Sequence, residues 1–222
     1  MPKALIIGAG DGLSASLARL LAREGYAVAL AARNTAKLAP LAAETGATIH
    51  ACDAADAAQV AALFTSEGDA EVVVYNPSYR TRGPIAELDP AEVQKSLQVC
   101  AFGGFLAVRE AARRMLAAGH GTILLTGASA GVKGYAQSAP FAMGKFALRG
   151  LAQSAARELH PQGVHVAHIV IDGGIRSTVH TDSGQDSLLD PDAIATNYLQ
   201  LVRQPRNAWS WELEIRPWVE KF

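Results

Sequence analysis

The chain has 222 residues, of which 50% are hydrophobic, and its 20 basic and 21 acidic residues give a formal net charge of -1. A chain of this length suits a single α/β domain over residues 1–222 that buries most of the surface of its unfolded state. The balanced charge indicates neither a nucleic acid nor an acidic membrane surface as a partner.

Cysteine usage and the N-terminus bear on the cellular compartment. Cys52 and Cys100 lie far apart in the sequence, which indicates no disulfide framework and suits a reducing environment. The first residues lack the basic region, apolar stretch and cleavage site of a signal peptide. No uninterrupted apolar segment reaches the roughly 20 residues of a transmembrane helix. We therefore expect a cytoplasmic protein that is not bound to a membrane.

Strand and helix patterns alternate along the chain. Short apolar runs bounded by turn residues predict strands at 4–7, 27–32, 48–52, 71–75, 122–126, 164–171 and 211–215. Apolar residues at helical spacing predict helices from 13, over 35–44, from 56, over 90–118, over 139–159 and from 190. This order predicts a Rossmann-like, doubly wound parallel sheet between two helix layers, with ligands at the carboxyl ends of the strands.

Several helix starts and one long loop also have recognisable sequences. Asp56 begins a capping-box pattern, and both Asp89 and Asp190 combine an N-capping aspartate with proline at the first helical position. The polar segment 176–189 predicts a mobile loop or lid, which together with the C-terminal segment would line a substrate pocket.

A glycine-rich turn follows the first strand. Gly8, Gly10 and Gly12 lie between this strand and the helix that begins at Leu13. Glycine takes positive φ and lets a ligand approach the backbone, and a helix N-terminus offers unpaired N–H groups to an anion. The turn therefore predicts a phosphate-binding corner, although the same pattern also suits a plain tight turn.

Over nearly its whole length, the chain resembles the short-chain dehydrogenase/reductase family. Gly8-x-x-x-Gly12-x-Ser14 is similar to the glycine motif of that family, with Ser14 in place of the third glycine. Asp53 matches its adenine-contacting aspartate, and Asn76 matches the second Asn of its Asn-Asn-Ala-Gly motif. The segment 172–177 is similar to its Pro-Gly-x-Ile-x-Thr segment, so that Ile175 would hold the nicotinamide carboxamide and Ser177 the phosphates. The expected cofactor-binding residues are Gly8, Gly10, Asp11, Gly12, Leu13, Arg33, Asp53, Ala54, Asn76, Pro77, Lys145, Gly173, Ile175 and Ser177.

The end of the second strand bears on the choice between NADP and NAD. A carboxylate there would bind the ribose hydroxyls of NAD, but this chain has Ala32 followed by Arg33, whose guanidinium suits a 2′-phosphate. Asp11 favours NAD instead, because family members that bind NADP often carry a basic residue in that turn. The alternative interpretation of Asp11 is that it is a helix N-cap. We expect NADP(H) to be favoured over NAD(H).

The catalytic residues are where the resemblance breaks down. Family enzymes use Asn, Ser, Tyr and Lys, and of these only Lys145 is in place. Phe141 occupies the tyrosine position, Ala128 the serine position with Ser129 one residue later, and Cys100 the asparagine position. The candidate catalytic residues are therefore Lys145, Phe141, Ser129 and Cys100, although Cys100 also suits plain helix packing.

Other hydroxyl-bearing residues are candidates for the missing acid. Tyr75, Tyr79 and Tyr135 lie on segments expected near the nicotinamide, and Ser129 would need to face inward. Each of these residues would also suit a packed or solvent-facing role, and we favour that role over the catalytic one.

Two pairs of ionisable residues also have competing interpretations. Arg80 and Arg82 would bind an anionic substrate or would simply be solvated in their loop. His165 and His168 lie in a predicted strand, where we expect core histidines with satisfied hydrogen bonds rather than a proton shuttle. No cluster has the spacing of metal ligands.

Two functions remain open on sequence grounds. The first is an NADP(H)-dependent oxidoreductase with a non-standard active site, acting on a small molecule such as a C=N or activated C=C compound. The second is a catalytically silent NADP(H)-binding sensor or regulator. In either case we expect a homodimer or homotetramer paired through the helices over 90–118 and 139–159. The small residues expected at that contact are Ala107, Ala111, Ala147 and Ala155.

Overall fold

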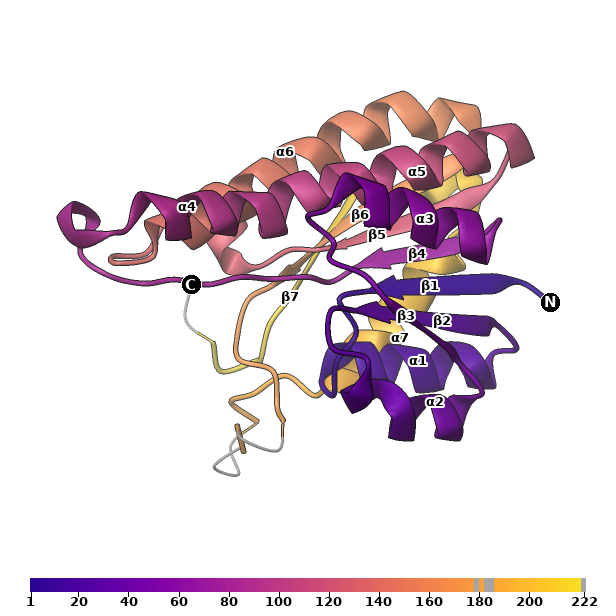
Figure 1. Ribbon diagram of the computed structural model, residues 1–222, viewed down its shortest axis with the longest axis horizontal. Helices are drawn as coiled ribbons and strands as arrows, with labels where there is room; N and C mark the ends of the chain where they lie inside the picture. Colours follow the sequence, from indigo (N-terminus) through magenta and orange to yellow (C-terminus); the bar gives the residue numbers. More distant parts are fainter. Residues whose placement is uncertain (178–179, 182–185, 221–222) are drawn as a thin grey trace.

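The computed structural model describes residues 1–177, 180–181 and 186–220. Within them, the strands form one parallel sheet of seven in the order β3-β2-β1-β4-β5-β6-β7 (Figure 1). The strands are β1 (Lys3–Ile7), β2 (Ala27–Ala32), β3 (Thr48–Ala51), β4 (Val72–Tyr75), β5 (Gly121–Thr126), β6 (Val164–Ile171) and β7 (Glu212–Ile215). The strand order reverses between β1 and β4, which confirms the predicted doubly wound sheet and places its topological switch point there.

Helices cover both faces of the sheet, as Figure 1 shows. One layer contains α1 (Leu13–Arg23), α2 (Ala39–Thr45) and α7 (Pro191–Val202). The opposite layer contains α3 (Ala57–Glu67), α4 (Pro90–Leu97), α5 (Gly103–Ala118) and α6 (Ala139–Leu159). The predicted three-layer α/β/α arrangement is therefore confirmed.

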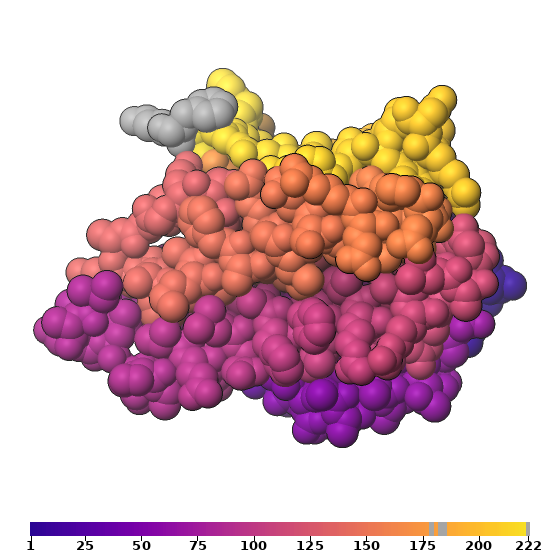
Figure 2. Space-filling view, turned by 90° about the horizontal axis from the view of Figure 1, so that it is seen from above, coloured from indigo at the N-terminus to yellow at the C-terminus, as the bar shows by residue number. Residues whose placement is uncertain are grey.

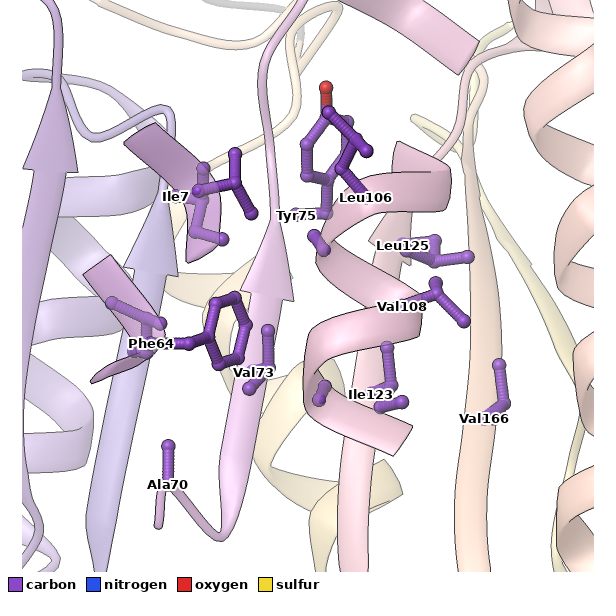
Figure 3. Close-up of a cluster of buried hydrophobic side chains, with 14 of the residues drawn as sticks. Ile7, Phe64, Ala70, Val73, Tyr75, Leu106, Val108, Ile123, Leu125 and Val166 are labelled. Atoms are coloured by element: carbon purple, nitrogen blue, oxygen red, sulfur yellow. The ribbon is translucent and has the colours of Figure 1, made fainter. Parts of the chain in front are cut away.

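The alternation of side chains along each strand produces two cores. On β4, Val73 and Tyr75 belong to the core beneath α3, α5 and α6, whereas Val72 and Val74 belong to the core beside α1 and α7. Figure 3 shows the first of these cores, where the Phe64 ring from α3 lies close to Val73. Because both faces of the strands are buried, the strands are apolar throughout.

Local capping follows the sequence at three helix starts. The Asp56 carboxylate accepts from the N–H groups of Ala58 and Gln59 at 2.9 and 3.0 Å. Asp89 and Asp190 likewise each accept from the N–H group two residues later. The capping interpretation of Asp11 is wrong, because Gly12 is the N-cap of α1 and no side chain caps that helix.

The helix predicted over 90–118 is present, and its hydrogen-bond pattern changes near the middle. A π-turn, Gln98–Phe102, separates α4 from α5 and contains Cys100. Single π-turns inside helices are rare and occur mainly near functional sites. The predicted loop over 176–189 is only partly described, since 178–179 and 182–185 lie outside the described residues. At its two ends, Ile175 forms a parallel bridge with Leu189.

The small residues expected at a subunit contact are mostly in the wrong place. Ala107, Ala111 and Ala155 are buried in the core of this chain, so a partner subunit does not reach them; only Ala147 is exposed. The exposed large apolar side chains of this layer are instead Phe102, Phe105, Leu116, Met143 and Phe146. They lie on the π-turn, α5 and α6, which run side by side in Figure 2.

The described part of the chain contains no helix that is both long and apolar enough to cross a membrane.

Candidate active site

A cavity of about 820 Å³ opens at the carboxyl ends of the central strands. Its walls come from the segments that follow β1, β4, β5 and β6 and from the start of α6. In a doubly wound sheet, this is the edge at which ligands bind. The cavity therefore lies where the sequence predicted a site.

The glycine turn forms one wall of this cavity and has room for a ligand. Gly8 has φ +81°, and a Cβ built on it would lie 2.6 Å from the backbone nitrogen of Pro77, so only glycine fits. A Cβ built on Gly10 or Gly12 would meet no atom within 4 Å. Since no side chain caps α1, its first N–H groups remain available to an anion. The turn thus fits the pyrophosphate of a dinucleotide.

Ser14 links the two strands at the switch point. Its hydroxyl donates to the Gly8 carbonyl at 3.2 Å and accepts from the Asn76 side-chain amide at 2.7 Å. Ser14 is buried, so this pair of bonds is shielded from water. The serine that replaces the third glycine therefore fixes the turn against the end of β4, a role that the sequence did not reveal.

Lys145 reaches the cavity from α6. Its side chain is 2% exposed, and its Nζ donates to the Thr126 carbonyl at 2.8 Å. Burial lowers the pKa of Lys145 to about 8. The Thr126 hydroxyl, in turn, shares a hydrogen bond of 2.8 Å with the Tyr198 hydroxyl on α7.

Phe141 lies one helical turn before Lys145 and also lines the cavity. Its ring is 3% exposed, with its centroid 5.7 Å from Lys145 Nζ and 4.3 Å from Arg80 Cζ. Phe141, Cys100 and Ala130 form a small buried cluster against which Ala128 packs. We call these four residues the apolar cluster. It contains the three positions at which the resemblance calls for Asn, Ser and Tyr.

Cys100, one of the expected catalytic residues, lies behind the cavity wall. It is fully buried and does not line the cavity. Its Sγ accepts from the Tyr79 N–H at 3.4 Å, and a Cβ built on Gly144 would lie 2.7 Å from the Cys100 Cβ. The thiol therefore joins the π-turn to the loop after β4, which is the packing role considered from the sequence.

The candidate replacement acids fall into two groups. The Tyr75 hydroxyl donates to the Val99 carbonyl, the Tyr79 hydroxyl bonds to Glu92, and neither tyrosine lines the cavity. Ser129 and Tyr135 do line the cavity, and Tyr135 is 46% exposed.

Most of the expected cofactor-binding residues lie together. Those that line the cavity are Gly8, Gly10, Gly12, Leu13, Asn76, Lys145, Gly173, Ile175 and Ser177. Those outside its wall are Asp11, Arg33, Asp53, Ala54 and Pro77. Of the latter group, Arg33 and Asp53 follow the neighbouring strands β2 and β3 and so lie at the same edge of the sheet.

The sequence also missed several wall residues, among them Ser78, Thr126, Ser138 and Glu220. Thr126 ends a predicted strand, and this position could have identified it as a wall residue.

The two histidines of β6 do not line the cavity. His165 bonds to the Ser210 carbonyl at 2.9 Å, and His168 bonds to Glu212 at 3.1 Å. Burial lowers the pKa of His168 to about 4, so its ring is neutral at physiological pH. Both histidines are buried, which confirms their expected location in the core. Each ring has one nitrogen without a hydrogen-bond partner in the described structure, so the expectation that all their hydrogen bonds are satisfied is wrong. Within the same residues, no three His, Cys, Asp or Glu side chains are grouped to hold a metal ion.

Comparison with known proteins identifies the family. The family model described as short chain dehydrogenase matches residues 2–187. The trans-4-hydroxycyclohexanecarboxylate dehydrogenase of Sinomonas cyclohexanicum is 30% identical over 178 residues, which cover 73% of this chain and 68% of that protein. A crystal structure of a short-chain dehydrogenase from Rhodopseudomonas palustris is 38% identical and superposes with a TM-score of 0.87 over 98% of this chain and 99% of that one.

A further solved structure is that of a metagenomic short-chain oxidoreductase in complex with NADP. It is 29% identical, with a TM-score of 0.85 over 97% of both chains. The protein belongs to the short-chain dehydrogenase/reductase family. It is therefore an oxidoreductase of a family that uses NAD(P).

The burial of Lys145 predicts a pH-dependent stability. Below pH 8 the folded protein holds a buried Lys145 ammonium, which lowers its free energy of unfolding. Between pH 8 and the usual lysine pKa of 10.5, Lys145 is neutral in the folded protein but still protonated in the unfolded chain, so the unfolded chain binds more protons than the folded protein. Stability of the wild type should therefore rise through this window. Lys145→Met should be more stable than wild type by about 1–3 kcal/mol at pH 7. The advantage should shrink as the pH rises to 10.5, as measured by urea denaturation without cofactor.

Lys37→Met is the control, because Lys37 is an exposed lysine on the short turn before α2. Its stability difference from wild type should stay constant across the same pH range. A Lys145→Met difference that is equally flat would show that Lys145 is not desolvated.

Proposed function

We propose that this protein is an NADP(H)-dependent oxidoreductase that adds hydride to an activated C=C bond without a tyrosine acid. The apolar cluster is the observation that supports this most directly, because Phe141 and Ala128 have no proton to donate. In a conjugate addition, the negative charge spreads over an electron-withdrawing group, so the transition state needs less protonation than that of a simple ketone. The Lys145 ammonium and the Arg80 guanidinium beside the Phe141 ring would stabilise that charge.

The chain's own residues would share the work as follows. Gly10, Gly12 and the N-terminus of α1 would hold the pyrophosphate, and Lys145 would donate to the nicotinamide ribose. When bound, the cofactor supplies a hydride equivalent. Phe141 would exclude water from one side of the acceptor, and the proton that completes the reduction would come from solvent through the open cavity.

Positioning alone can support useful rates. Loss of a general acid costs about 10²–10⁴ in rate, whereas holding a donor against an acceptor contributes ~7–11 kcal/mol. We therefore favour catalysis over the alternative, a catalytically silent NADP(H)-binding sensor. The apolar cluster also suits this alternative, and the experiments on Phe141 below separate the two.

The first prediction concerns cofactor choice. Arg33 is exposed directly after β2, next to Ala32 rather than a carboxylate. Arg33→Ala should weaken NADPH binding by about 1.5–3 kcal/mol through loss of a charge-assisted contact, and it should leave NADH binding unchanged. Calorimetric titration measures both, with Arg23→Ala at the exposed end of α1 as the control. Equal losses for the two cofactors would contradict the NADP preference.

The second prediction restores the missing hydroxyls. Phe141→Tyr combined with Ala128→Ser should raise NADPH-dependent reduction of simple activated ketones by at least about tenfold. The Lys145 cation would lower the pKa of the new phenol, and the serine would donate a second hydrogen bond to the carbonyl. NADPH affinity, measured in parallel, should not fall.

Wild-type turnover of 2-cyclohexen-1-one with NADPH is the companion measurement. If wild type reduces this enone and Phe141→Tyr slows the reaction, the phenylalanine belongs to a different mechanism from the family's usual one. If wild type and the double variant both bind NADPH and neither reduces any acceptor, the sensor function is correct and catalysis is excluded.

The third prediction concerns self-association. We propose a dimer or tetramer that pairs through the exposed apolar residues of the π-turn, α5 and α6, where Phe102 and Phe105 lie with ring centroids 6.1 Å apart. Phe105→Asp with Phe146→Asp should give a monomer by light scattering at micromolar concentration, because it buries charge in the contact. Ile85→Asp, at another exposed apolar position, should not change the mass. A monomeric wild type would contradict the assembly.

A further inference from the structure

The cavity wall contains two arginines that the cofactor does not account for. Arg80 and Arg82 lie on the segment between β4 and α4, and both line the cavity. The phosphate groups of a dinucleotide are expected instead at the glycine turn and at Arg33. Neither Arg80 nor Arg82 has a carboxylate partner within 4.0 Å among the described residues.

Arg80 is held in a defined place over the site. Its Cζ lies 4.3 Å from the centroid of the Phe141 ring, a cation–π contact that holds the guanidinium over the ring face. Because Phe141 lies one helical turn before Lys145, the stack places Arg80 at the part of the cavity where the acceptor would be bound. Partial burial, together with the neighbouring Arg82, lowers the pKa of Arg80.

The loop that carries the arginines is anchored on both sides. The Tyr79 carbonyl accepts from the Ser96 hydroxyl at 3.1 Å, and the Tyr79 N–H donates to Cys100 Sγ. After Arg82, the Gly83 N–H donates to the Gln137 carbonyl at 3.1 Å, which joins this loop to the segment before α6. Figure 1 shows the loop running out beyond the carboxyl end of β4 toward α4. These contacts hold the loop that carries both arginines against the helices beside the cavity.

The charge of the cavity wall is unbalanced at this end. Of the two carboxylates on the wall, Asp172 is already paired with Lys133 and Arg216, and Glu220 belongs to the C-terminal segment. Arg176 is paired with Asp190. Among the described residues, the wall side chains whose positive charge has no carboxylate partner are Arg80, Arg82 and Lys145.

We propose that the substrate carries a carboxylate, and that Arg80, assisted by Arg82, binds it through the planar guanidinium stacked on Phe141. A guanidinium matches a carboxylate with two parallel hydrogen bonds, and the aromatic stack holds it ready for that contact. This assignment rests on the proposed function, because it names the substrate class of the same site. The substrate is thus a small acid whose reducible bond lies between Lys145 and Arg80.

Binding of a matched pair of ligands tests the proposal without requiring turnover. The probes are 4-oxopentanoate and its uncharged counterpart 4-oxopentanamide, titrated calorimetrically into the protein with and without NADPH. The carboxylate should bind at least about tenfold more tightly than the amide to the NADPH complex. Arg80→Gln should reduce this preference to below about threefold, Arg82→Gln should reduce it partly, and Arg80→Lys should be intermediate.

Arg23→Gln, which removes one positive charge far from the cavity, is the control and should leave the preference intact. Equal binding of the two probes, no binding of either, or a preference that survives Arg80→Gln would overturn the proposal. So would a preference that disappears when NADPH binds, because the arginines would then serve the cofactor. If the preference holds and neither 2-cyclohexen-1-one nor the unsaturated acid 4-oxopent-2-enoate is reduced with NADPH, the proposed catalysis fails while the acid-binding site stands.

Discussion

The close contact between the first turn and the end of β4 is the constraint on which the site depends. At Gly8, any side chain would collide with Pro77, so the turn after β1 and the segment after β4 lie in direct backbone contact at this point. The Ser14 hydroxyl then joins the Gly8 carbonyl to Asn76 across the same gap. These contacts fix the width of the crevice between the two halves of the sheet, and the remaining walls of the cavity are built outward from it.

Beyond the crevice, the site combines the apolar cluster with the positively charged side chains of Lys145 and Arg80. The three positions at which the sequence resemblance calls for Asn, Ser and Tyr carry Cys100, Ala128 and Phe141, and these side chains pack together. Lys145 approaches the Phe141 ring from within α6, and Arg80 approaches it from the loop after β4. Such a site can stabilise negative charge on a bound molecule, while its apolar cluster has no hydroxyl to donate.

Local sequence signals were sufficient for the fold, and most of the cofactor-binding residues expected from them line one cavity. The glycine turn, the capping aspartates and the apolar strands each act over a few residues, so they could be identified in order along the chain. Cys100 lies in a π-turn and away from the cavity, and the local sequence pattern did not distinguish this turn from the helix around it. Ala107 and Ala111 were misassigned because small residues on a helix suit a core and a subunit contact equally well. The Thr126–Tyr198 hydrogen bond joins residues far apart in sequence, which no local pattern encodes.

The stack of Arg80 on Phe141 has an evolutionary consequence. Phenylalanine and tyrosine codons differ at a single base, and a tyrosine ring offers the same aromatic face to the guanidinium. The change from phenylalanine to tyrosine would therefore keep the cation–π contact while adding one hydroxyl. One nucleotide substitution therefore separates this chain from one with a phenol at position 141. An exchange between phenylalanine and tyrosine in either direction would keep the contact between Arg80 and the aromatic ring.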